Sequence, residues 1–405
     1  MLRRGIERAL KAALADTPVV LLTGARQVGK STLAQTLVPE DRYYTLDDTT
    51  LLAAAQADPT AFVGRHDRTI VIDEIQRVPD LLLAIKASVD RDRRPGRFLL
   101  TGSAKIQFVP RVAESLVGRM EILTLWPFSQ GEIVGRREGF LEAICQKRLP
   151  GNPTPLPVEE MAARIVRGGY PPVYTWAERR RAAWLRSYVT GVLERDIREL
   201  TTIEALAALP RLIALLATRV ATLVNLADIS RSVGIPHTTL QRYMALLERT
   251  FLVHQVPAWG MKLGSRVVKA GKLLFADTGL ATALLHLSAV RVPKEPIGGP
   301  MLENFVIMEL WKQASWLAEW PRIYHFRTPK GLEVDAVVEG EAGEILGIEV
   351  TQSQTVRGED FRGLHELARL AGRRFRIGVI LYLGRKVVPF GNNLYAVPMA
   401  ALWEW

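Results

Sequence analysis

The chain has 405 residues, of which 48% are hydrophobic and 23% are charged. This composition is typical of a folded protein and excludes an intrinsically disordered one, and the length is sufficient for roughly two to four domains. The net charge is +11, and most of the positive excess lies within residues 131–300. A basic region in an otherwise balanced chain favours a polyanionic partner such as DNA, although a solvated basic surface has the same composition.

Cysteine usage and hydropathy indicate the compartment. The single cysteine, Cys145, excludes an internal disulfide and agrees with a reducing cytoplasm. No segment approaches the ~20 consecutive apolar residues that are needed to span a bilayer. We therefore expect a cytoplasmic protein without membrane contact.

The first 130 residues alternate between predicted helices and strands. Residues 1–15 fit an amphipathic helix, with Ile6, Leu10 and Leu14 on its apolar side and Arg3, Arg4 and Lys11 on its polar side. Apolar runs then predict strands at 19–24, 43–46, 69–74, 97–103 and 120–129, with helices at 30–37 and 80–89. Strands and helices that alternate at this spacing predict a doubly wound parallel sheet.

A glycine-rich loop follows the first strand. Residues 24–31 read GARQVGKS, which fits the phosphate-binding pattern G-x4-G-K-[ST] between a strand and a helix. Lys30 can reach the β- and γ-phosphates and the Ser31 hydroxyl can bind Mg²⁺. The residues expected to bind ATP are Gly24, Ala25, Arg26, Gln27, Val28, Gly29, Lys30, Ser31 and Thr32.

Acidic residues end the strand at 69–74. Asp73 can face the magnesium ion together with Ser31, and Glu74 can act as the general base on the attacking water. Ser103, at the end of a neighbouring strand, can orient that water or cap a helix. Arg119, just before the next strand, can reach the nucleotide of a neighbouring subunit as an arginine finger, or form a structural salt bridge.

Several segments together resemble a known family. GARQVGKSTL, YYTLDD, TIVIDEIQRVPDLLLAIK, RFLLTGSA, SLVGRMEIL and GGYPPV look like the bacterial and archaeal AAA+-type ATPases that carry the C-terminal domain of unknown function DUF4143. The later segments ERDI, LFADTGLA, LENFVIMEL and LEVDAVVE resemble that C-terminal region. The resemblance covers nearly the whole chain, and it implies a homo-oligomeric, hexameric ring ATPase that uses ATP and Mg²⁺.

The basic middle of the chain contains a helix-turn-helix pattern. Leu226, Ile229 and Val233 have helical spacing, Gly234 interrupts the helix, and Leu240, Tyr243, Leu246 and Leu247 form the apolar side of a second helix. A strand follows, so residues 205–260 predict a winged helix-turn-helix. The outward residues expected to contact DNA are His237, Thr238, Gln241 and Arg242. Such a module also serves as a protein-packing element.

Three carboxylates in the last third resemble a restriction-endonuclease-like metal site. Glu303 is expected on a helix, and Asp335 and Glu349 on strands, where together they could hold Mg²⁺. Thr351 stands where such a site has lysine, although Gln352 or Lys330 could supply the missing polar group. We therefore expect a degenerate nuclease fold that is used for binding or assembly.

The resulting domain assignment has five parts: an AAA+-type ATPase core at 1–130, a helical lid region at 131–204, the winged helix-turn-helix at 205–260, an irregular linker at 261–300, and the degenerate restriction-endonuclease-like α/β domain at 301–405. Three functions fit this order. The first is an oligomeric ATPase that remodels or translocates duplex or branched DNA. The second is an ATP-dependent regulatory switch or toxin–antitoxin-like protein that binds an operator or a partner protein. The third is an ATP-gated, Mg²⁺-dependent nuclease.

Overall fold

The computed structural model describes residues 2–64, 66–102, 116–149, 151–194, 204–261, 270–318 and 321–405. Contacts divide the chain into two compact units. One comprises Arg3–Pro127 with Arg249–Phe251, and the other comprises Phe128–Glu248 and Leu252–Trp405 with Leu2. The predicted domain boundaries remain predictions, except for the segment 261–300.

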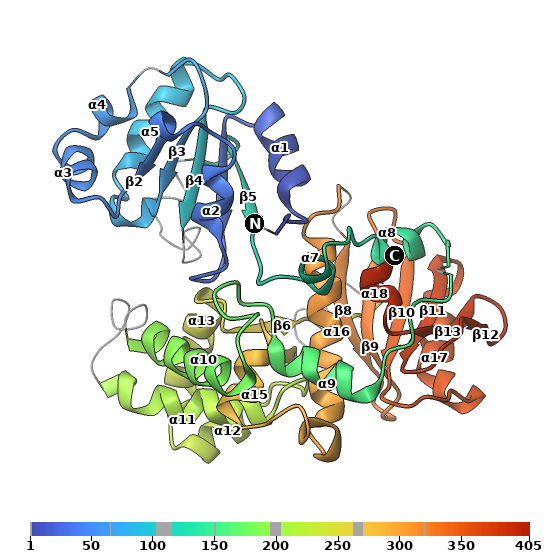
Figure 1. Cartoon of the computed structure of the whole chain (residues 1–405). Coiled ribbons are helices and arrows are strands. Elements are labelled where there is room, and N and C mark those ends of the chain that lie inside the picture. Colours follow the sequence, from blue (N-terminus) through green and yellow to red (C-terminus); the bar gives the residue numbers. More distant parts are fainter. Residues whose placement is uncertain are drawn as a thin grey trace. The chain divides into compact units, whose positions relative to one another are not determined.

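The first unit is a parallel α/β sheet with helices on its faces (Figure 1). In the described residues its five strands have the order β2-β3-β4-β1-β5, and neighbouring strands run parallel. The strands are β1 (Val19–Thr23), β2 (Tyr43–Thr45), β3 (Ile70–Asp73), β4 (Phe98–Gly102) and β5 (Met120–Thr124). The helices are α1 (Glu7–Asp16), α2 (Lys30–Gln35), α3 (Thr49–Ala57), α4 (Pro59–Val63) and α5 (Leu81–Arg91). The predicted fold of this region is therefore confirmed.

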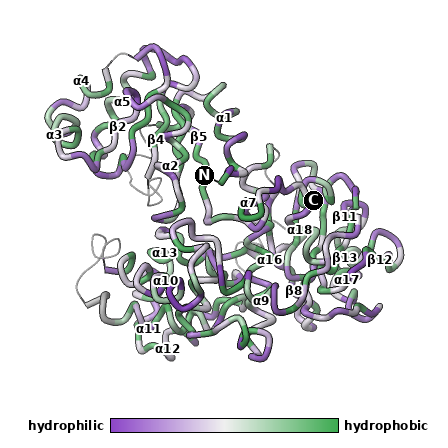
Figure 2. The backbone as a smooth tube through the Cα atoms, in the orientation of Figure 1, coloured by the Kyte–Doolittle hydropathy of each residue, from purple (hydrophilic) through white to green (hydrophobic). Residues whose placement is uncertain are grey.

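Apolar side chains explain this sheet. All residues of β1, β3 and β4 are buried, as expected for strands covered on both faces. Their core side chains pack with those of α5, including Ile85 and Val89. In Figure 2 hydrophobic residues run along these strands, whereas hydrophilic residues gather in the loops around them. The strand predicted over 120–129 ends earlier, at Thr124.

The N-terminal helix differs from its prediction at one residue. Ile6, Leu10 and Ala13 are buried, as the apolar spacing of α1 requires. Arg4, which was predicted on the polar side, lies just before the helix and is only 6% exposed. Its guanidinium group donates to main-chain oxygens of the same unit, which explains how a charge is accommodated there.

The second unit begins with a helical region. Its helices are α7 (Gln130–Val134), α8 (Phe140–Cys145), α9 (Val158–Arg167), α10 (Glu178–Val192), α11 (Glu204–Thr218), α12 (Leu226–Val233) and α13 (His237–Arg249). Asn225 caps α12 through its side chain, and Gly234 ends that helix in the left-handed conformation. The antiparallel strands β6 (Val253–Val256) and β7 (Lys272–Phe275) follow α13.

The prediction of an irregular linker at 261–300 was wrong for its described part. Strand β7 and helix α15 (Thr278–Leu284) lie in this segment and are largely buried. Some of the glycines and prolines that favoured a linker lie within helices: Gly279 in α15, and Gly298, Gly299 and Pro300 in the first turn of α16 (Gly298–Ala314). Asp277 caps α15 by accepting from the Gly279 N–H, so the segment is part of the folded core.

The end of the chain forms a mixed sheet. In the described residues six strands have the order β12-β13-β11-β10-β9-β8. They are β8 (Arg322–Arg327), β9 (Glu333–Glu339), β10 (Ile345–Val350), β11 (Phe375–Tyr382), β12 (Val388–Pro389) and β13 (Leu394–Pro398), accompanied by α16 (Gly298–Ala314), α17 (Arg362–Ala371) and α18 (Ala401–Glu404). Strands β8–β10 are antiparallel neighbours, whereas β10, β11 and β13 run parallel. Helix α17 packs its leucines on this sheet.

None of the helices that the structure describes is both long enough and apolar enough to cross a bilayer.

Candidate active site

The loop after β1 has the backbone geometry of a phosphate cradle. Gly24 and Gly29 adopt φ angles of 149° and 94°, and Gln27 adopts 64°, so the chain turns through conformations that side chains disfavour. A Cβ atom on Gly24 would lie 2.2 Å from the Leu125 carbonyl oxygen. Glycine is therefore required at this position by both its backbone angle and its close neighbour.

Lys30 brings a positive charge to this loop. Its side chain is largely buried, and its Nζ donates to the carbonyl oxygens of Gly24 at 3.1 Å and of Ala25 at 2.8 Å. The ammonium group is thus held over the loop. When a nucleotide binds, the ammonium group can exchange these carbonyl acceptors for phosphate oxygens while it stays at the loop.

Asp73 lies at the centre of a hydrogen-bond network at the carboxyl end of β3. Its Oδ1 accepts from the Ser31 hydroxyl at 2.9 Å and from the Thr101 hydroxyl. Its Oδ2 accepts from the Tyr43 hydroxyl at 2.7 Å. Burial and the neighbouring Asp73 carboxylate raise the pKa of Tyr43, so the phenol stays protonated and remains a donor. Sequence reasoning paired Ser31 with Asp73 correctly but missed Tyr43 and Thr101.

Glu74 follows Asp73 in a strained conformation. Its φ of 59° is left-handed, which is uncommon for a residue with a side chain. Its N–H donates to the Thr101 hydroxyl at 3.2 Å, and its carboxylate accepts from the Gln76 side-chain amide. Thr101 therefore connects the two acidic residues, and the turn directs Glu74 away from the strand axis.

The donor set fits a magnesium ion and a triphosphate. Ser31 and Asp73 offer hydroxyl and carboxylate oxygens 2.9 Å apart, and oxygen ligands are those that Mg²⁺ prefers. The positive φ angles of Gly24, Gln27 and Gly29 turn the main chain of this loop as an anion-binding loop requires. These residues are thus arranged as an ATP site requires.

Comparisons with known proteins identify the family. A family model described as an AAA domain matches residues 16–134, and two domains of unknown function, DUF8612 and DUF4143, match residues 158–291 and 298–402. The chain is 32% identical over 403 residues to the uncharacterized protein Rv2008c of Mycobacterium tuberculosis, covering 98% of this chain and 83% of that protein. Protein Mb2031c of Mycobacterium bovis, also uncharacterized, matches to the same extent. The chain belongs to the AAA ATPases that carry a DUF4143 domain.

The solved structures that resemble this AAA ATPase share little of its sequence. The Walker-type ATPase PABY2304 of Pyrococcus abyssi is 16% identical, with 69% of this chain and 94% of that chain covered and a TM-score of 0.38. The RuvB Holliday junction branch migration motor of Thermotoga maritima is 20% identical, with 62% and 89% covered and a TM-score of 0.29.

Two further residues predicted for the ATPase site have different outcomes. Arg119 pairs with the Asp90 carboxylate at 2.6 Å and donates to the Val117 carbonyl at 3.1 Å. The hydrogen bond from Arg119 lowers the pKa of Asp90. Within one chain Arg119 therefore forms the structural salt bridge, and its role as a finger between subunits stays a prediction. Ser103 lies outside the described residues.

The DUF4143 region brings the predicted carboxylates to a lysine that sequence reasoning missed. Lys272 of β7 is only 4% exposed in its side chain, and its Nζ pairs with the Glu303 carboxylate of α16 and lies 3.8 Å from Asp335 Oδ1. Asp335 also accepts from the Val350 N–H at 2.8 Å. The positive charge here comes from Lys272 rather than from Gln352 or Lys330. Its position at the start of the apolar strand KLLF was the available signal.

Two carboxyl groups of this acidic cluster, those of Glu303 and Glu349, have raised pKa values and so hold their protons more strongly than exposed carboxyl groups do. Burial and the Asp335 charge raise the pKa of Glu303 to about 8 and that of Glu349 to about 9, although Lys272 lowers both. Among the residues that the structure describes, no group of three or more His, Cys, Asp or Glu is arranged to hold a metal ion. The metal site at Glu303, Asp335 and Glu349 stays a prediction, and the structure adds Lys272 beside two of its carboxylates.

The four residues predicted to contact DNA lie together on one helix. His237, Thr238, Gln241 and Arg242 occupy the first turns of α13, and all four are exposed. Leu240 and Leu247, on the opposite side of α13, are fully buried. The predicted orientation of this helix is thus confirmed, while its DNA contact stays a prediction.

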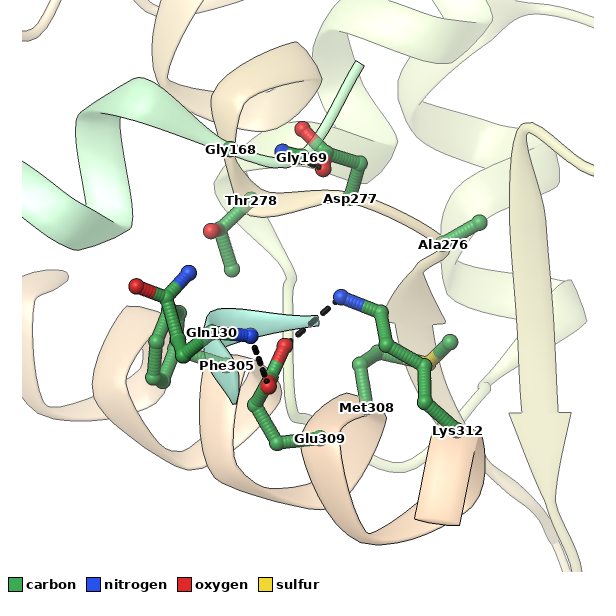
Figure 3. A pocket seen from close by; sticks show the side chains of 10 residues that line it. All are labelled: Gln130, Gly168, Gly169, Ala276, Asp277, Thr278, Phe305, Met308, Glu309 and Lys312. Carbon is green, nitrogen blue, oxygen red and sulfur yellow. Dashed lines mark hydrogen bonds and ion pairs between the residues drawn. The ribbon is translucent and has the colours of Figure 1, made fainter. Parts of the chain in front are cut away.

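The family segments downstream of the AAA domain form a buried polar network (Figure 3). The Glu309 carboxylate pairs with Lys312 Nζ at 2.6 Å and accepts from the Gln130 N–H at 2.8 Å. The Asp277 carboxylate accepts from the Gly169 N–H at 2.6 Å. The cavity between them has a volume of about 10 Å³, room for one water at most. These residues therefore connect segments of the fold that are distant in the sequence.

Proposed function

We propose that this AAA ATPase hydrolyses ATP with Mg²⁺. The observation that carries the proposal is the hydrogen bond between Ser31 and Asp73, at 2.9 Å, together with the Lys30 ammonium group that is held on carbonyl oxygens of the same loop. Bound Mg²⁺ would neutralise charge on the phosphates, and Ser31 and Asp73 would hold it. Lys30 would bind the β- and γ-phosphates, and the loop N–H groups would bind the oxygens that remain.

Glu74 would take the proton from the attacking water. Support comes from its place directly after Asp73 at the end of β3, and from the Gln76 amide, which donates a hydrogen bond to its carboxylate. General-base catalysis of this kind contributes typically about 10²- to 10⁴-fold to the rate. Thr101 supports this geometry by bonding both to Asp73 and to the Glu74 N–H.

Tyr43 gives a first test of the magnesium site. We expect Tyr43→Phe to raise the Mg²⁺ concentration for half-maximal hydrolysis about tenfold, because removing a group that orients a metal ligand typically costs that much in affinity. The maximal rate at saturating Mg²⁺ should change much less. Titrating hydrolysis with Mg²⁺, and Mn²⁺ binding by electron paramagnetic resonance, measure the effect.

Tyr44→Phe is the matched control for this experiment. Tyr44 is the next residue along β2, and its ring packs on Phe62 at a centroid distance of 5.8 Å. The control should keep the wild-type Mg²⁺ requirement. An unchanged requirement in Tyr43→Phe would show that Asp73 needs no support from the phenol.

We further propose that the ATPase acts as an oligomer and couples hydrolysis to binding and remodelling DNA. Support comes from the exposed polar start of α13, which follows a helix and a tight turn, and from the positive charge of residues 131–300. The strands β6 and β7 after α13 give the order of a winged helix-turn-helix. Hexameric assembly, with Arg119 reaching a neighbouring nucleotide, belongs to the same proposal.

DNA-stimulated hydrolysis tests this second proposal. Duplex and branched DNA should increase turnover, and the stimulation should fall steeply with salt because phosphate contacts release counterions. Arg242→Ala should weaken the stimulation several-fold and leave hydrolysis without DNA unchanged. Arg373→Ala removes an equally exposed arginine elsewhere and is the control. If DNA does not change the rate of ATP hydrolysis by the wild type, the regulatory switch would be favoured instead.

A further inference from the structure

Arg4 is a buried cation at the back of the phosphate-binding loop. Its Nη1 donates to the Val28 carbonyl oxygen at 2.7 Å, and its Nη2 donates to the Trp126 carbonyl oxygen at 2.6 Å. Val28 belongs to the loop, and Trp126 follows β5. One guanidinium group therefore joins the loop to the chain segment that leaves the sheet.

The position of Arg4 is fixed by the helix that follows it. The Glu7 N–H donates to the Arg4 carbonyl at 3.2 Å as α1 begins. Ile6 and Leu10 are 2% and 0% exposed, so α1 is anchored in the core of its unit. The planar, forked guanidinium group can then hold two carbonyl oxygens in a defined geometry, which an ammonium group does less well.

A second, independent contact joins the same two segments. The Leu125 N–H donates to the Thr23 carbonyl at 2.7 Å, and Gly24 approaches the Leu125 carbonyl so closely that a Cβ atom would clash. The loop is thus attached to residues 125–126 near its first residue, through Gly24, and near its end, through Val28. Within the loop, Lys30 Nζ also donates hydrogen bonds to the carbonyl oxygens of Gly24 and Ala25.

Carbonyl direction decides whether such a loop binds phosphate. A phosphate cradle works because N–H groups point toward the anion and carbonyl groups point away. Lys30 can be drawn to a phosphate, whereas Arg4 is held by the Trp126 carbonyl as well as by the loop. The bond from Arg4 fixes the Val28 carbonyl, and this orientation sets the peptide that links Val28 to Gly29.

We propose that Arg4 is a positioning residue of the nucleotide site: it holds the Val28 carbonyl so that the N–H groups of Gly29 and Lys30 face the phosphates. The inference rests on the proposed ATP binding. It adds a residue that lies outside the AAA domain match at residues 16–134. Arg4 does not contact the nucleotide, and it acts through the loop.

The test compares nucleotide affinity in Arg4→Ala, Arg4→Lys and Arg3→Ala, in the full chain, by titration with fluorescent ADP and ATP analogues. Arg4→Ala should weaken binding of both about tenfold to a hundredfold, because it removes hydrogen bonds from a charged group. Arg4→Lys should restore part of the affinity, since lysine can keep one of the two bonds. Arg3→Ala should bind like the wild type, because Arg3 is exposed.

Val89→Ala separates positioning from simple destabilisation. It removes a buried side chain of α5, in the core of the same unit but on another helix than the one that follows Arg4, and thermal unfolding without nucleotide gives the stability loss of each variant. At a temperature where all variants are folded, Val89→Ala should keep its affinity while Arg4→Ala loses it. Equal affinity in Arg4→Ala and the wild type, or equal losses in Arg4→Ala and Val89→Ala, would overturn the inference. A wild-type chain that binds no nucleotide would instead refute the proposed function.

Discussion

Glu74→Gln is expected to bind ATP with near wild-type affinity and to hydrolyse it about 10²- to 10⁴-fold more slowly. Glutamine keeps the size of the side chain and can still contact Gln76, but it cannot accept a proton from water. The hydrogen bonds around Asp73 do not involve this carboxylate, so the magnesium ligands should remain in place. Single-turnover hydrolysis with labelled ATP, together with binding of an ATP analogue, measures both effects.

Two other variants make this result specific. Lys30→Ala should lose nucleotide binding itself, because it removes the cation from the loop. Glu40→Gln changes an exposed carboxylate of the same unit in the same way and should leave both binding and hydrolysis unchanged. Wild-type turnover in Glu74→Gln would assign the general base to another residue.

The parts of this site that are close in sequence to a motif could be predicted. The loop 24–31 specifies its own backbone, because each glycine stands where the chain needs a left-handed angle. Asp73 and Glu74 end an apolar run, and residues at the carboxyl end of a parallel strand lie at the edge where the loop also opens. Local pattern and strand direction were sufficient for these residues.

The missed residues depend on contacts that a pattern does not encode. Thr101 meets Asp73 because β4 lies between β3 and β1, and this strand order is not readable from the sequence. Tyr43 meets it because β2 pairs with β3 on the other side. Arg4 shares its spacing with exposed arginines, and only its tertiary position distinguishes it. Local periodicity therefore predicted the elements of the sheet better than the partners across it.

The second unit shows the same limit at Lys272. From the sequence, a lysine at the start of an apolar strand is expected to be an exposed strand end. In the structure β7 pairs with β6, and Lys272 contacts carboxylates of α16 and β9. The glycines and prolines around β7 favoured a linker in the sequence. Burial of this segment depends on α15 and α16, whose packing is a long-range property.

At pH 9, replacing Lys272 with methionine should lower the free energy of unfolding by about 3–5 kcal/mol, because at this pH the change leaves buried carboxylates without their cation. Methionine retains much of the volume of the lysine stem, so the loss reports charge rather than a cavity. Chemical denaturation of the second unit, followed by circular dichroism, measures it. Lys294→Met changes an exposed lysine nearby and should have little effect.

The destabilisation should also grow between pH 6 and pH 9. In the folded protein the pKa of Glu303 is raised to about 8 and that of Glu349 to about 9, so their stabilising contribution is lost as pH rises through these values. Lys272 lowers both pKa values, and without it the two carboxyl groups become still harder to ionise. The variant must therefore lose stability with pH faster than the wild type. Adding Glu303→Gln should recover part of the loss at pH 9, since it removes one of the charges that Lys272 neutralised. A destabilisation that is equal at both pH values, with no recovery in the double variant, would mean that Lys272 contributes through packing alone.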